Sequence, residues 1–178
     1  MNKSELLARE AAAGDAAAFG VLVRQHQSKL RGFLLRMTRG NHALADDLAQ
    51  ETFLEAFRKI AQFGTGSFFG WLSAIAYSRY LMEARRRKLE SLDEMGEMPD
   101  DAPEPETASA SKLDLEKAMA RLVPAQRAAL TLCFALGLSH EEAAAALDMP
   151  LGTLKSHVNR GREKLAGMLA VWRNKAVS

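Results

Sequence analysis

The sequence predicts an all-α protein made of two small helical domains joined by an acidic flexible linker. Apolar residues recur at helical spacing along most of the 178 residues, and no convincing strand-like alternation is found. One segment, residues 91–112, interrupts the helical pattern and places the two domains at residues 1–90 and 113–178. With 48% hydrophobic residues, both domains can form a packed core.

The first domain is predicted to form four helices, at residues 4–14, 15–40, 42–63 and 68–88. Ser4 and Asp15 are the expected N-caps of the first two helices, because both side chains can accept hydrogen bonds from free amides. The sequence GTGS, residues 64–67, breaks the pattern between the third and fourth helices. The fourth helix ends in a run of four basic residues, 85–88.

Composition changes sharply in the linker. It holds three of the five prolines, and residues 91–112 carry seven acidic residues and one basic residue. Such a segment cannot bury enough apolar surface to offset the entropy lost on ordering. Residues 1–90 carry 14 Lys and Arg against nine Asp and Glu, and residues 113–178 carry nine against six. Two basic blocks suit a polyanionic partner such as nucleic acid.

Several classes of protein are disfavoured by the composition. Cys133 is the only cysteine, so an intramolecular disulfide and a cysteine-cluster metal site are excluded, and the four histidines show no ligand-like pairing. We expect no metal and no cofactor. No nucleophile–base constellation or phosphate-binding glycine loop is present, so an enzyme is not expected. The polar N-terminus and the absence of a long apolar stretch predict a cytoplasmic protein without membrane insertion.

The second domain is predicted to end in a helix-turn-helix. Two helices come first, at residues 113–122 and 124–136. Ser139, with Glu142 three residues later, then forms a capping box for a short alanine-rich helix. The turn DMPLG follows, and a last helix turns Leu154 and Val158 toward the core.

The outward face of that last helix is cationic and rich in hydrogen-bonding groups. It carries Lys155, Ser156, His157, Asn159, Arg160 and Lys164. Such side chains suit base edges and phosphates. An ordinary helical hairpin with a solvated polar face is the alternative. The capping box, the turn and the small residues between the helices favour DNA binding.

Longer strings in both domains resemble one family. The string ADDLAQETFLEAFRKIAQF (residues 45–63), followed by SFFGWLSAIA and ARRRK, resembles region two of extracytoplasmic-function sigma factors. The string that begins AMARLVPAQRAAL and continues through the helix-turn-helix resembles region four of the same family. The order and the position of the linker also match. The resemblance implies an RNA polymerase sigma factor that binds core polymerase and directs promoter-specific initiation.

The resemblance implies roles for three sets of residues. The set that binds core polymerase is Asp46, Asp47, Gln50, Glu51 and Leu54. The set that binds the minus-ten element and holds the strand open is Phe63, Ser67, Ser78, Arg79, Arg85, Arg86, Arg87 and Lys88. The set that binds the minus-thirty-five element is His140, Glu141, Lys155, Ser156, His157, Asn159 and Arg160. Without the resemblance, the first set is an ordinary solvated helix face, and Phe63, Phe68 and Trp71 are core residues.

The sequence departs from the family pattern in its minus-ten set. The loop at residues 64–67 is one residue shorter than the common form. Ser78 stands where an asparagine is usual, Met82 where an aspartate is frequent, and Phe69 where an arginine or tyrosine is common. These departures slightly favour an alternative, a sigma-like decoy or adaptor that binds a regulator without supporting initiation. The intact basic recognition helix argues against it.

The resemblance also implies partners for the chain. These are core RNA polymerase, promoter DNA and an anti-sigma factor wedged between the two domains. For the acidic linker, two roles stay open: imitation of a transcript in the RNA path of the polymerase, and a merely soluble tether.

Overall fold

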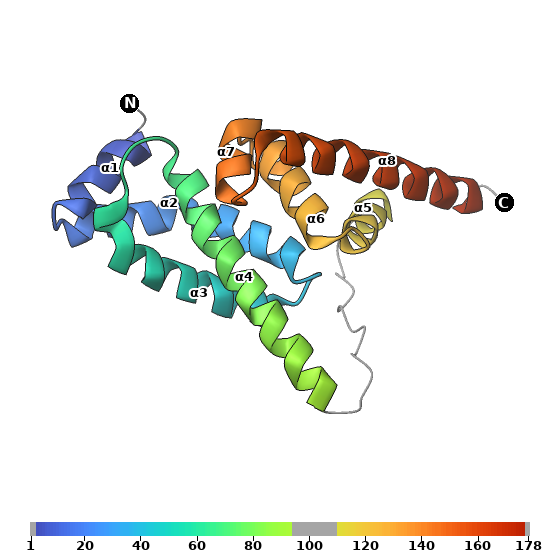
Figure 1. The fold of residues 1–178 in the computed structure, drawn as a ribbon, viewed down its shortest axis with the longest axis horizontal. Helices are drawn as coiled ribbons and strands as arrows, with labels where there is room; N and C mark the ends of the chain where they lie inside the picture. The colour runs from blue at the N-terminus through green and yellow to red at the C-terminus, as the bar shows by residue number, and fades with distance from the viewer. Residues whose placement is uncertain (1–2, 94–109, 177–178) are drawn as a thin grey trace.

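The computed structural model describes residues 3–93 and 110–176, and every regular element within them is helical. The first half contains α1 (Lys3–Ala12), α2 (Ala16–Met37), α3 (His42–Lys59), the 3-10 turn η1 (Ile60–Gln62) and α4 (Phe68–Asp93). The second half contains α5 (Ala110–Ala120), α6 (Pro124–Leu130), the π-helical turn η2 (Thr131–Ala135), α7 (His140–Ala146) and α8 (Leu151–Ala176). The predicted all-α fold is confirmed (Figure 1).

Polar side chains cap α2 and α3. The Asp15 carboxylate accepts hydrogen bonds from the amides of Ala17 at 2.8 Å and Ala18 at 3.1 Å, as predicted. Asn41 caps α3 in the same way, accepting from the amide of Leu44 at 3.0 Å. These oxygens satisfy amides that have no partner within the helix, and they set where each helix begins.

The prediction that Ser4 is an N-cap is wrong. Ser4 lies inside α1, and its hydroxyl is 3.1 Å from Nε2 of His26 on α2. The His26 ring is buried against the rings of Phe68 and Phe69 at the start of α4. Ser4 supplies a polar partner for Nε2 of the buried imidazole, whereas Nδ1 has no hydrogen-bond partner among the described residues.

The helices that flank the linker are longer than the sequence predicts. The end of α4 continues through residues 91–93, and α5 already begins at residue 110, so helices enter both ends of the predicted linker. Side-chain pairs one turn apart support the extension: Arg86 pairs with Glu90, and the Ser91 hydroxyl donates to the carbonyl of Lys88 at 2.9 Å. The linker prediction for residues 94–109 lies outside the described residues.

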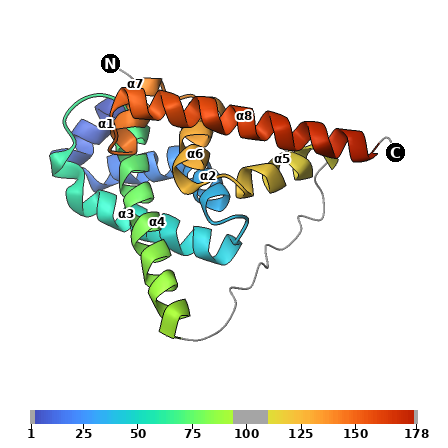
Figure 2. The ribbon, with the colours of Figure 1, turned by 45° about the vertical axis from the view of Figure 1, so that its right-hand side comes forward.

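The two halves pack against each other. Their buried apolar side chains form one cluster that runs from α1 to α8. The start of α4 packs against α7, and α2 packs against α5 and α6, as the two views in Figures 1 and 2 show. The second half of α4 extends away from this core (Figure 1). Its side chains from residue 84 to 90 are exposed. The described part of the chain therefore has a continuous interface between the halves.

Candidate nucleic-acid interface

The helix-turn-helix is built around the predicted capping box, which is confirmed. The Ser139 hydroxyl accepts a hydrogen bond from the amide of Glu142 at 3.1 Å, and the Glu142 carboxylate accepts one from the amide of Ser139 at 2.8 Å. Asp148 adopts a left-handed conformation (φ 50°), which turns the chain sharply between α7 and α8. Buried Ala143 and Ala144 let the two helices approach closely.

The recognition helix α8 separates an apolar from a polar face. Leu154 and Val158 are buried, whereas Lys155, Ser156, Asn159 and Arg160 are exposed. The Ser156 hydroxyl donates to the carbonyl of Gly152 at 3.0 Å, so it uses its proton within the helix. No described residue forms a hydrogen bond or ion pair with the side chains of Lys155, Asn159 or Arg160, so their donors are available for a ligand.

Of the three remaining residues of the minus-thirty-five set, His140 and His157 are half-buried and Glu141 is exposed. His157 is half-buried, and its Nδ1 has no hydrogen-bond partner among the described residues. His140 is also half-buried at the start of α7, next to exposed Glu141. Hydrogen bonds from the backbone amide of Glu141 itself and from the Ser139 hydroxyl lower the pKa of Glu141. Its carboxylate therefore places negative charge at the N-terminus of α7.

Gly161 is a residue of this motif that sequence reasoning missed. At Gly161 the two helices α8 and α6 approach closely, because a Cβ there would lie 2.8 Å from Cδ1 of Leu130. Leu154, Val158 and Gly161 follow one another at intervals of four and three residues. This helical spacing could have placed Gly161 on the buried face of α8.

The basic run of α4 is exposed but partly paired. Glu83 accepts hydrogen bonds from Arg86 and Arg87, each at 2.7 Å, and Arg86 also pairs with Glu90. The hydrogen bond from Arg86, followed by that from Arg87, lowers the pKa of Glu83 to about 2. Arg85 and Lys88 form no ion pair with any described residue, so they are the most available cations of the run.

Arg79 of α4 forms ion pairs with two carboxylates of α3. It pairs with Glu55 and lies 3.6 Å from Glu51, and both carboxylates belong to α3. The hydrogen bond from Lys59, followed by that from Arg79, lowers the pKa of Glu55. The pairs tie α4 to α3, whereas the neighbouring Ser78 is exposed. Arg79 therefore joins the predicted minus-ten set to the predicted polymerase-binding set.

Two other members of the minus-ten set have local partners. Phe63 is only 7% exposed and packs edge-to-face on Phe68 and Trp71, with ring centroids 5.8 and 5.6 Å away. The Ser67 hydroxyl accepts a hydrogen bond from the amide of Gly70 at 3.0 Å, at the start of α4. Both residues shape the loop, whose exposed part is residues 64–66.

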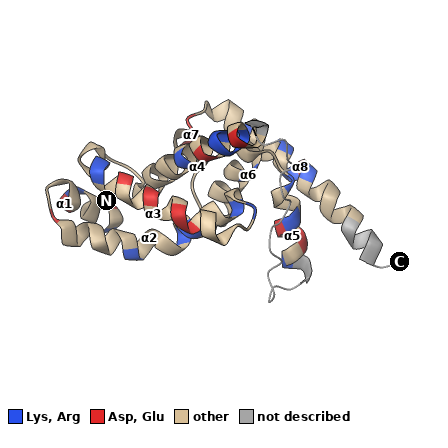
Figure 3. Ribbon diagram, turned by 90° about the horizontal axis from the view of Figure 1, so that it is seen from below, with Lys and Arg blue, Asp and Glu red and all other residues tan. Residues whose placement is uncertain are grey.

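The predicted polymerase-binding set lies along one side of α3, where acidic positions gather in Figure 3. Asp47, Gln50 and Glu51 are exposed, Leu54 is 58% exposed, and Asp46 is half-buried. The structure adds Phe57, a neighbour of Leu54 on the helix, which is 50% exposed and packs one edge on Phe19. Sequence reasoning missed Phe57, although its place three residues after Leu54 continues the same face.

No helix within residues 3–93 or 110–176 has an apolar stretch long enough to cross a bilayer.

Comparison with known proteins defines the class. The family model described as Sigma-70 region 2 matches residues 22–90, and the one described as Sigma-70, region 4 matches residues 112–165. The first match contains most of the α1–α4 half, and the second contains the helix-turn-helix. The class is therefore that of the sigma-70 proteins.

Individual relatives narrow the class. The ECF RNA polymerase sigma factor SigE of Mycolicibacterium smegmatis is 40% identical over 169 residues, which span 89% of this chain but 65% of SigE. EcfG of Rhodopseudomonas palustris, another ECF sigma factor, is 37% identical over 145 residues, which span 80% of each chain. The sigma factor RpoE of Bartonella quintana, solved with the anti-sigma factor NepR, is 31% identical with a TM-score of 0.77, covering 86% of this chain and 97% of RpoE. The chain belongs to the ECF RNA polymerase sigma factors.

Proposed function

We propose that this chain binds core RNA polymerase and directs it to promoters, reading the minus-ten element with residues 1–90 and the minus-thirty-five element with residues 113–178. The observation that carries the proposal is the helix-turn-helix: a capped α7 supports an α8 whose exposed face presents Lys155, Asn159 and Arg160. Amide and cationic donors on a helix that fits the major groove are suited to base edges and phosphates.

In the minus-thirty-five element, Lys155 and Asn159 contact base edges, and Arg160 contacts the phosphate backbone. Ser156 and Glu141 are both exposed and contribute polar groups to the motif. His140 and His157 support the motif from half-buried positions.

At the minus-ten element, the exposed cations of α4 contact the phosphates of the DNA. Arg85 and Lys88 are available at once, because they are unpaired among the described residues. Arg87 becomes available when it leaves Glu83, and Arg86 when it leaves both Glu83 and Glu90. Phe63 and Ser67 act by holding the loop at residues 64–66 in shape. Ser78 lies on the exposed side of α4, beside the DNA path.

Core polymerase binds the acidic side of α3, through Asp47, Gln50 and Glu51 with an apolar contribution from Leu54 and Phe57. Charge on the rim of such a surface speeds and orients association, while the apolar pair is desolvated on binding. The segment between α4 and α5 connects the two readers. Two weak readers on one tether gain affinity because the second binds at a raised effective concentration.

The chain itself carries out no chemistry and acts in the cytoplasm, where its polymerase partner is. An anti-sigma factor is its proposed inhibitor, because the RpoE neighbour was solved in such a complex.

Run-off transcription with purified core polymerase and a library of randomised promoters tests the proposal. The full chain is expected to select templates with two conserved elements, and Lys155→Ala with Asn159→Ala to lose the upstream one. Selection of no template by a chain that still binds core polymerase contradicts initiation and supports the decoy or adaptor. The capping-box variant Glu142→Gln, which keeps the hydrogen-bonding oxygen, is the matched control.

A further inference from the structure

The exposed loop at residues 64–66 is tied to α1, an element far away in the sequence. The amide of Gly66 donates a hydrogen bond to Oε1 of Glu5 at 3.5 Å, across 61 residues of sequence. Within the described part of the chain, this is the only hydrogen bond that the three loop residues form. The loop lies beside α1 in both views of the chain (Figures 1 and 2). Glu5 therefore gives the loop its polar support from outside.

Glu5 is itself held in place by its surroundings. Its side chain is 16% exposed, and Nη2 of Arg9, one turn later on α1, donates to the same Oε1 at 3.4 Å. The helix packs on α2 through buried Ala8, and the Ser4 hydroxyl lies 3.1 Å from Nε2 of His26. A carboxylate on a packed helix is a more precise support than one on a second loop.

The hydrogen bond reaches the part of the loop that has no other restraint. The two ends have neighbours of their own, because Phe63 is buried and the Ser67 hydroxyl accepts a hydrogen bond from the amide of Gly70. Gly66 lies between these ends with φ 100°, a left-handed conformation that favours glycine. Without Glu5, the middle of the loop is free to take other backbone conformations while its ends stay fixed.

The helix α1 lies outside the sequence that matches the family model. The region 2 match begins at residue 22, whereas α1 ends at Ala12. A position in the region 2 pattern therefore assigns no role to Glu5. The hydrogen bond to Gly66 is the observation that connects α1 with the loop between Phe63 and Ser67.

On the basis of the proposed function, we propose that Glu5 is a positioning residue for minus-ten recognition, which holds Gly66 so that the loop at residues 64–66 meets the DNA strand in one conformation. A loop that already has its bound conformation loses less entropy on binding, so it binds more tightly and discriminates better between bases. Glu5 acts through the loop and contacts no DNA itself.

Nuclear magnetic resonance tests the contact without reference to promoters. In Glu5→Ala, the amide proton of Gly66 loses its acceptor, so its signal is expected to move upfield. The backbone order parameters of residues 64–66 are expected to fall, because the middle of the loop gains freedom on the fast timescale that they report. Glu5→Gln keeps an acceptor oxygen and is expected to retain most of the order.

Glu10→Ala is the charge control for this measurement, because Glu10 is an exposed carboxylate on the same helix. It should leave the Gly66 signal and the order parameters unchanged. An unchanged Gly66 signal in Glu5→Ala, or an equal effect of Glu10→Ala, overturns the contact.

Run-off transcription tests the consequence for promoters. The measured quantity is the ratio of initiation on the selected promoter to initiation on promoters with single-base changes, taken separately for each element. Glu5→Ala is expected to lower the minus-ten ratio about two- to fivefold, the size of one weak hydrogen bond, and to leave the minus-thirty-five ratio unchanged. Glu5→Gln is expected to restore most of the minus-ten ratio. A loss of folded chain lowers initiation on all promoters alike, so both ratios are insensitive to stability.

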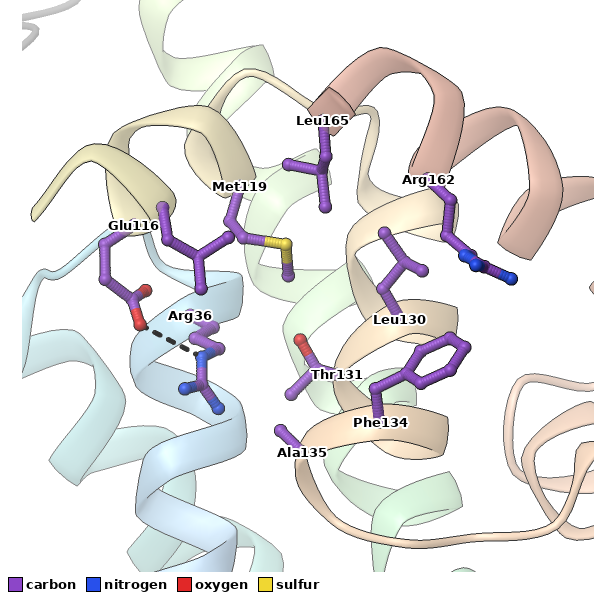
Figure 4. A pocket seen from close by; sticks show the side chains of 10 residues that line it. Arg36, Glu116, Met119, Leu130, Thr131, Phe134, Ala135, Arg162 and Leu165 are labelled. Atoms are coloured by element: carbon purple, nitrogen blue, oxygen red, sulfur yellow. Dashed lines mark hydrogen bonds and ion pairs between the residues drawn. The ribbon is translucent and has the colours of Figure 1, made fainter. Parts of the chain in front are cut away.

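Glu116→Ala is the matched control for a lost contact between elements. Glu116 of α5 is 35% exposed and accepts a hydrogen bond from Nε of Arg36 on α2 at 3.3 Å, beside an apolar pocket (Figure 4). In Figure 1, α5 lies at the opposite end of the molecule from α1, so this variant should leave the minus-ten ratio unchanged.

An unchanged minus-ten ratio in Glu5→Ala, or an equal loss in Glu116→Ala, overturns the positioning role of Glu5. If the unchanged chain initiates with core polymerase at no promoter, the proposed function fails and the minus-ten role of Glu5 fails with it. The contact between Glu5 and Gly66 then stands or falls by the resonance result.

Discussion

Arg31 of α2 donates from Nε to Oδ1 of Asp46 on α3, at 2.6 Å, with the two side chains 55% and 47% exposed. The contact ties the first turn of α3 to α2 and satisfies one oxygen of Asp46. The neighbouring Asp47 is exposed and forms no ion pair with a described residue. The two adjacent carboxylates therefore differ: Asp46 is held by Arg31, whereas Asp47 is available to a partner.

This difference predicts unequal effects on polymerase binding. Asp47→Ala is expected to weaken the affinity for core polymerase by roughly tenfold, or about 1.4 kcal/mol, whereas Asp46→Ala loses only about two- to threefold. Fluorescence anisotropy with labelled chain and purified core enzyme measures both. Arg31→Ala is the control, since it frees Asp46 and leaves the rest of α3 unchanged. Equal losses for the two aspartates contradict the ranking.

Glu83 is expected to restrain DNA binding by the basic run. Glu83→Gln releases Arg87, leaves Arg86 with Glu90 as its one carboxylate partner and removes a negative charge beside both, so the affinity for DNA should rise about two- to fivefold at low salt. The slope of log affinity against log salt should steepen, because more phosphates are neutralised. Titration of binding across a salt series measures both. Glu10→Gln, an exposed change of the same charge on α1, is the comparison, and an equal gain there refutes a local role for Glu83.

Gly161 is expected to be intolerant of a side chain. Gly161→Ala should lower the free energy of unfolding by about 1–2 kcal/mol, because the added methyl meets buried Leu130, and this cost exceeds the gain in helix propensity. Gly167→Ala has open space around its Cβ and should stabilise the same helix by about 0.5–1 kcal/mol. Urea unfolding followed by circular dichroism measures both. Stabilisation by both changes shows that the contact relaxes freely.

His26 is expected to make stability fall in mildly acidic solution. Burial, followed by the charge of Lys29, lowers the pKa of His26 below its ordinary value of 6.5. Below about pH 6.5 the unfolded chain takes up a proton at this site that the folded chain resists, so the unfolded state gains as pH falls. Stability is retained above that pH. Unfolding in urea at pH 7.5 and 5.5 should show the loss.

His26→Phe is expected to flatten that pH dependence, because the site can no longer be protonated. His42→Gln serves as the comparison, since His42 is exposed at the start of α3. A pH dependence that survives in His26→Phe assigns the effect to another group.

Helix caps could be predicted from the sequence where the capping side chain and its partner lie within one short segment. The Ser139–Glu142 capping box and the Asp15 cap each depend on residues within one turn, and both are confirmed. Ser4 was misassigned because its partner, His26, is 22 residues away. The roles proposed for Phe63 and Ser67 come from their positions in the family pattern. Such a position does not reveal that the Phe63 ring packs on Phe68 or that the Ser67 hydroxyl accepts a hydrogen bond from Gly70.

The helical fold, the helix-turn-helix and the two-part organisation follow from the amino-acid sequence, because helical periodicity and capping depend on residues a few positions apart. Packing in three dimensions sets which cations and carboxylates are paired, and it brings the two halves together around Arg127 of α6. Its carbonyl partner at Met37 is 90 residues away, and a backbone oxygen has no signature in a sequence. Only the meeting of two helix ends around a buried guanidinium reveals that contact.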